Sequence, residues 1–77
     1  MIFKIEENTK EEQLKKLKET KDKEIILDLE NIQFLTSKDI SRLLIAVKGG
    51  KKISFVNSNE HIKETIAVLN LQNIINI

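Results

Sequence analysis

The stretch IILDLENIQFLTSKDISRLL, from Ile25 to Leu44, decides the fold of this chain. Its first part belongs to residues 24–29, a near-continuous aliphatic run interrupted at Asp28, which predicts a central strand covered on both faces of a sheet. Its second part leads into residues 38–48, where apolar side chains recur at helical spacing. This spacing predicts a helix with one apolar stripe, formed by Ile40, Leu43, Leu44 and Val47.

The turn between these two segments, residues 33–39, is where we expect a function. A helix that begins directly after a buried strand points unpaired backbone N–H groups outward, so a partner, a phosphate or another anion could be received there. The connection 30–36 contains Ile32, Phe34 and Leu35 and is more apolar than a solvated loop. We therefore expect it to pack onto the core.

The rest of the chain continues the alternation of strands and helices. Residues 1–6 and 52–57 have the composition of strands, and residues 71–77 could add a short edge strand. A surface helix is predicted from a capping box at Thr9 and Glu12 to about residue 20. Gly49 or Gly50 ends the middle helix, and a last helix follows a cap at Ser58 or Asn59, with these residues on one face: Ile62, Ile66 and Leu69.

Because the connections between strands are too long for hairpins, the sequence predicts an α/β fold with a mostly parallel sheet. We expect about four strands and three helices, in the order βαβαβα with an optional final strand. With 77 residues, the chain has room for one domain, residues 1–77, around one modest core.

The composition disfavours several classes of function. Thirteen Lys and Arg against twelve Asp and Glu leave the chain almost neutral, and three Phe without Tyr or Trp offer little for base stacking, so no nucleic acid is expected as a partner. Without cysteine, there are no disulfides or thiol chemistry. No apolar run approaches the roughly 18 residues of a membrane span, and MIFKIEENTKEE lacks the apolar core of a secretion signal. We expect a cytoplasmic chain without membrane insertion.

No catalytic constellation emerges, and we expect neither an enzyme nor a cofactor or metal site. The only histidine, His61, lies at the start of the last helix and is interpreted as a solvated surface residue. Asp28 has two interpretations. It is either a buried carboxylate with a raised pKa that relays protons, or a residue that reaches solvent and accepts hydrogen bonds from the following turn; the second is favoured.

Two hydroxyl residues stand at the start of the helix 38–48. Either Thr36 or Ser37 can be its N-cap, and Thr36 with Asp39 approximates a capping box. An exposed hydroxyl at this position is alternatively a phosphorylation site, because a phosphate would meet the helix N-terminus and change the charge that a partner encounters.

The central pattern resembles the signature of STAS domains, the family of bacterial anti-sigma-factor antagonists. In both, an apolar strand with an aspartate leads through an apolar turn to a hydroxyl residue at the start of a helix; here the pattern is Leu27-Asp28-Leu29, Ile32, Phe34-Leu35-Thr36-Ser37, Ile40 and Leu43-Leu44. The resemblance extends over residues 24–77. Of the family's Asp-Ser-Ser/Thr-Gly signature, Ser37 stands at the phosphorylatable serine, while the other three positions are Thr36, Lys38 and Asp39.

This resemblance implies a protein-interaction module for partner switching in transcription regulation. The partner would be an anti-sigma factor with serine kinase activity, and phosphorylation of Ser37 would block docking. The implied docking surface is Thr36, Ser37, Lys38, Asp39, Ser41 and Arg42. The alternative is a non-catalytic accessory subunit of a lipid-transporting ABC-type ATPase, with the same helix as a permanent docking surface. The exposed edge of a small sheet also leaves a homodimer open.

Overall fold

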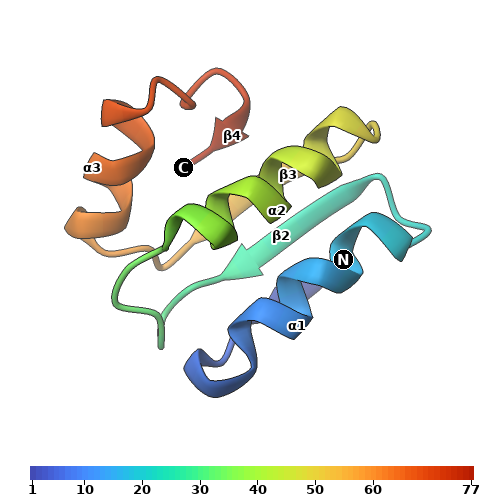
Figure 1. Cartoon of the computed structure of the whole chain (residues 1–77), viewed down its shortest axis with the longest axis horizontal. Coiled ribbons are helices and arrows are strands. Elements are labelled where there is room, and N and C mark those ends of the chain that lie inside the picture. The colour runs from blue at the N-terminus through green and yellow to red at the C-terminus, as the bar shows by residue number, and fades with distance from the viewer.

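A computed structural model describes all 77 residues, and its four strands form one parallel sheet (Figure 1). The strands are β1 (Ile2–Lys4), β2 (Glu24–Asp28), β3 (Lys52–Val56) and β4 (Ile75–Asn76). The α-helices are α1 (Lys10–Lys15), α2 (Ser37–Lys48) and α3 (Glu60–Val68), and two short 3-10 helices, η1 (Glu7–Thr9) and η2 (Lys16–Glu19), flank α1. The predicted α/β fold, including the final edge strand, is confirmed.

All helices lie on one face of the sheet. The spatial order of the strands, β1-β2-β3-β4, equals their order in the chain, so every crossover steps to the next strand in the same direction. Right-handed crossovers of this kind place each helix on the same side, and Figure 1 shows α1, α2 and α3 in front of the strands. The molecule measures 30 × 27 × 20 Å, and its shortest dimension corresponds to one sheet and one layer of helices.

Strand β2 is central, but only one of its faces is covered. Buried Ile25 and Leu27 point toward the helices, whereas Ile26 and Asp28 are half-buried and Glu24 is exposed. The prediction of a strand covered on both faces was wrong, because no crossover passes behind the sheet. We call the uncovered side the open face; its outward residues are Ile2, Lys4, Glu24, Ile26, Asp28, Lys52, Ser54, Val56 and Asn76.

The core contains 16 buried hydrophobic residues from the inner face of the sheet, the helices and the connection 30–36. Helix α2 contributes Ile40, Leu43 and Ala46, while Leu44 and Val47 of the predicted stripe are only partly buried. The connection packs down through Ile32 and Leu35, as predicted. Its third apolar residue, Phe34, is exposed, so that part of the prediction was wrong.

The first helical segment differs from its prediction. The expected capping box at Thr9 does not form, and only α1 is α-helical between the two 3-10 helices. The side chain of Gln13 takes the role instead: its Oε1 accepts from the Glu6 N–H at 2.8 Å, and its Nε2 donates to the Lys4 carbonyl at 3.1 Å. Gln13 thereby ties α1 to the end of β1, and Leu14 is buried beneath.

The end of α2 and the start of α3 are set by residues that suit these positions. Gly49 is the C-cap of α2, and the next residue, Gly50, has φ of +96°, the left-handed conformation that favours glycine. Asn59 caps α3 by accepting a hydrogen bond from the Ile62 N–H at 2.8 Å. Ile62 and Ile66 are buried as predicted, but Leu69 is exposed, because α3 ends at Val68 and Leu69 is its C-cap.

Candidate functional site

The start of α2 is closed by a reciprocal capping box. The Thr36 hydroxyl accepts from the Asp39 N–H at 3.2 Å, and Asp39 Oδ2 accepts from the Thr36 N–H at 2.8 Å. Thr36 is therefore the N-cap, which confirms one of the two interpretations of this pair of hydroxyl residues. Ser37 is the first helical residue; it is exposed, and the cap does not need its hydroxyl.

A buried ion pair lies directly beneath this cap. The ammonium nitrogen of Lys10 is 3.0 Å from Asp39 Oδ2 and donates to the Phe34 carbonyl at 3.1 Å. Lys10 is 8% exposed and Asp39 is 2% exposed. The Phe34 ring covers the ammonium, with 5.3 Å between Lys10 Nζ and the ring centroid. Asp39 is thus an internal anchor of α2, and its predicted role as a docking contact was wrong.

The other residues of the predicted docking surface divide into two groups. Thr36, Ser37, Lys38 and Ser41 are exposed together on the first turns of α2. Arg42 is half-buried, and its Nη2 lies 3.3 Å from Glu11 Oε1, so it joins α2 to α1. The structure brings the four exposed residues together and leaves Arg42 mainly between the two helices.

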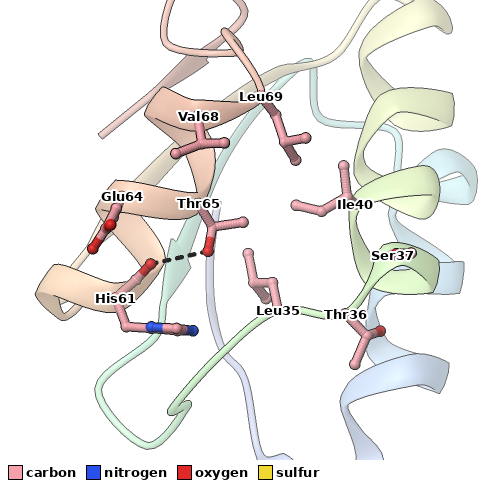
Figure 2. A pocket seen from close by; sticks show the side chains of 9 residues that line it. All are labelled: Leu35, Thr36, Ser37, Ile40, His61, Glu64, Thr65, Val68 and Leu69. Carbon is pink, nitrogen blue, oxygen red and sulfur yellow. Dashed lines mark hydrogen bonds between the residues drawn. The ribbon is translucent and has the colours of Figure 1, made fainter.

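A groove with a volume of about 560 Å³ opens between α2 and α3 (Figure 2). We call it the α2–α3 groove. Its apolar residues come from both walls, since Leu35 and Ile40 face Val68 and Leu69 across it, and Val68 is 75% exposed. Its polar lining consists of Thr36, Ser37, His61, Glu64 and Thr65. Ser37 therefore stands beside an accessible apolar cavity.

The α3 wall of this groove was missed by sequence reasoning. Leu69 was placed in the buried stripe of the helix, and Val68 was given no role. A local signal was present for Val68, which lies two positions after Ile66 and therefore on the other side of the helix from the buried stripe. The excess apolar residue at the helix end indicates a second contact surface.

The side chains around the mouth of the groove offer hydrogen bonding rather than metal binding. His61 is exposed, as predicted, and its ring meets the Phe34 ring edge-on with centroids 6.5 Å apart. The Thr65 hydroxyl donates to the His61 carbonyl at 3.0 Å (Figure 2). No group of three or more His, Cys, Asp or Glu side chains in the molecule is arranged to hold a metal ion.

Asp28 joins the ends of two strands, away from the groove. Its Oδ1 accepts from Asn57 Nδ2 and from the Glu30 N–H, both at 3.1 Å. The bond from Asn57 first, and then the bond from Glu30, lower the pKa of Asp28 below its usual value. The interpretation that Asp28 serves the following turn is confirmed, and a proton relay with a raised pKa is contradicted.

The lowered pKa of Asp28 predicts an acid-sensitive contribution to stability. Stabilisation from a carboxylate whose pKa is lower in the folded state is present above the unfolded pKa of about 3.9 and is lost as the pH falls through the folded pKa. We expect Asp28→Asn to lower the melting temperature near pH 7 and to lose less stability than the parent on acidification to about pH 2.5. Circular dichroism melts at both pH values measure this difference.

The matched control for this experiment is Asp22→Asn, which alters an exposed carboxylate in the turn before β2. It should follow the parent at both pH values. If the parent and Asp28→Asn lost stability in parallel on acidification, the hydrogen bonds to Asp28 would not be a source of the pH dependence.

No helix of the chain combines the length and the apolar character that crossing a membrane requires. Comparison of the chain with protein-family models, with curated protein sequences and with solved structures finds no match. The function of the chain is therefore inferred from the residues described above, with Ser37 and the α2–α3 groove as the candidate site.

Proposed function

We propose that this chain is a protein-interaction module that acts as an anti-sigma-factor antagonist, the role that its resemblance to STAS domains implies. One observation carries the proposal: Ser37, at the position of the family's phosphorylatable serine, is exposed beside an apolar groove. Thr36 already supplies the helix cap, so Ser37 is available for modification without loss of that cap.

The groove provides the chemistry of docking. Leu35, Ile40, Val68 and Leu69 offer apolar surface to an apolar segment of the anti-sigma factor, and burial of this surface supplies the driving force. The polar residues of the α3 wall, including His61 and Glu64, can fix the orientation of the bound segment through hydrogen bonds. The exposed Lys38 and Ser41 extend this surface along α2.

Phosphorylation of Ser37 would act on docking and leave the fold intact. A phosphate at the first residue of α2 lies at the positive end of the helix dipole, where negative charge is stabilising. A partner that fills the apolar groove must instead remove water from that dianion, which is unfavourable. The phosphate on Ser37 therefore stabilises the folded domain and weakens binding of the partner.

The test measures the affinity for the partner and the stability of the domain on one set of variants. Affinity is measured by calorimetry with the host's anti-sigma factor as the ligand. We expect Ser37→Ala to bind like the parent and Ser37→Asp to bind at least about tenfold more weakly, which is about 1.4 kcal/mol. Thermal unfolding of Ser37→Asp should stay within about 1 kcal/mol of the parent, because an acidic residue in the first helical turn is favourable.

Asn73→Asp is the matched control, because it adds the same charge at an exposed position outside the groove. Its affinity should equal that of the parent. Equal affinities for the parent, Ser37→Asp and Asn73→Asp would contradict the proposed switch. If the chain instead co-purified with a transporter ATPase and Ser37 stayed unmodified, the groove would be a permanent docking surface and the accessory-subunit role would replace this proposal.

A further inference from the structure

The open face of the sheet is an apolar surface that no element of the chain covers. Parallel sheets are normally covered on both sides, yet Ile2 is 69% exposed here and Val56 and Ile26 also face outward. The face is hollowed near the start of β2 and β3, where Ile26, Ser54 and Ile74 are among the residues that line a cavity of about 750 Å³. This shape can receive side chains from outside.

Charges on this face are ordered in rows by the register of the strands. The middle row, Ile2-Ile26-Ser54-Asn76, carries no charge. In the row at the start of the strands, acidic Glu24 lies beside basic Lys52. In the row at the ends of the strands, basic Lys4 lies beside acidic Asp28. The outer rows therefore carry opposite charges on neighbouring strands.

We propose that a second copy of this chain covers the open face, with a two-fold axis parallel to the strands and located between β2 and β3. This axis sets β2 of one copy opposite β3 of the other. Glu24 then faces Lys52 of the second copy, and symmetry repeats this ion pair. Ile26 faces the small Ser54 of the second copy and enters the cavity on the open face of that copy.

The charge pattern disfavours two other face-to-face arrangements. A two-fold axis perpendicular to the strands at Ile26 would set Asp28 against Glu24 of the second copy, twice. An axis along β2 would set Glu24 against Glu24 and Asp28 against Asp28. Like charges in contact across an interface are repelled, so both of these arrangements are disfavoured. An axis between β1 and β2 would pair Lys4 with Asp28, but it would leave β3 and β4 uncovered, whereas the axis between β2 and β3 covers all four strands. It also keeps the strands of the two sheets aligned, as face-to-face sheets commonly are.

The size of the face sets the expected strength of the dimer. The four strands have 3, 5, 5 and 2 residues. With about 3.3 Å per residue and about 4.8 Å between strands, they give a footprint of roughly 240 Å². This is well below the roughly 800 Å² per partner of a standard stable interface. We expect a reversible dimer with a dissociation constant on the order of 100 µM, so the concentration range of the experiment must extend to about 1 mM.

Sedimentation equilibrium of the purified chain tests the dimer. The parent should change from monomer to dimer over this range, and Ile26→Lys should weaken association at least about tenfold. Ile2→Lys, at a more exposed position of the same face, should act in the same direction if Ile26→Lys does not fold. The matched control is Ile45→Lys, which places the same charge on an exposed apolar position of α2 and should associate like the parent.

Charge reversal tests the orientation. Glu24→Lys and Lys52→Glu should each remain monomeric, because each sets like charges opposite one another. Mixing the two variants should restore association in heterodimers, and so should combining both substitutions in one chain. A parent that stays monomeric at about 1 mM, or a dimer that Ile26→Lys and Ile2→Lys do not weaken, would overturn the proposal. Mixed variants that fail to associate would overturn the proposed axis. The groove lies on the opposite, helical side of the sheet, so these outcomes are independent of the proposed function.

Discussion

Asp39→Ala is expected to lower the free energy of unfolding by about 3 kcal/mol, because it removes the nearer and buried counter-charge of the Lys10 ammonium and leaves only the half-exposed Glu7 carboxylate, 3.4 Å away. The substitution also removes the acceptor of the Thr36 N–H, and the loss of a helix cap alone is worth about 1 kcal/mol. A chain of 77 residues has a total stability of roughly 4–12 kcal/mol. The combined loss of about 4 kcal/mol would therefore remove between about a third and all of the total stability.

Urea unfolding of three variants separates the two effects at Asp39. Thr36→Ala removes only the hydroxyl of the capping box and should lower stability by about 1 kcal/mol. The double variant Lys10→Met/Asp39→Ala should be more stable than Asp39→Ala alone, because no uncompensated charge stays buried. A loss of only about 1 kcal/mol in Asp39→Ala would show that the ion pair adds nothing to the cap.

Leu43→Ala is expected to lower the free energy of unfolding by about 3–4 kcal/mol. Leu43 is 0% exposed and lies in the centre of the α2 stripe, so the substitution loses apolar burial and leaves a cavity in a core that is already small. A one-sided sheet offers only a single core, and no second layer is present to compensate. The expected loss is a large fraction of the total stability.

The comparison for Leu43 is Ile45→Ala on the same helix. Ile45 is 50% exposed, so its truncation should change stability by less than about 1 kcal/mol. Both variants alter a branched aliphatic residue of one α-helix to alanine, and the effect on intrinsic helix propensity is therefore small in each. Similar losses in the two variants would contradict the assignment of Leu43 to the centre of the core.

The parts of the fold that were predictable from sequence are those with local causes. Helix α2 begins within one residue of its expected start, because the Thr36–Asp39 capping box and the spacing of Ile40 and Leu43 are both local patterns. The open face was not predictable in this way. Ile26 and Ile25 are identical in type and adjacent in sequence, and only the direction of successive crossovers decides which of them faces the helices.

The same distinction between local and tertiary causes applies to the residues of the candidate site. Ser37, Lys38 and Ser41 were expected at the surface and are exposed there. The inward position of Asp39 had a local signal, because Asp39 shares a helix face with Leu43 and Ala46. Its pairing with Lys10 had none, since the two residues come from different elements and the approach of α1 to α2 is a property of the complete fold.

The arrangement of the strands in chain order has a consequence for how the domain assembles and extends. Each strand pairs only with its immediate predecessor and successor, so the domain is a linear array of strand-helix units. Paired strands are separated by 22 to 28 residues, as in Ile53–Ile75 and Glu24–Lys52, so each unit must close a loop of that length before its strand can pair. In a linear array the terminal unit is held from one side only, and β4, with two residues, should exchange its amide hydrogens before β2 and β3 do. Both outer strands are sites where evolution or design could append a further unit without rearranging the existing ones.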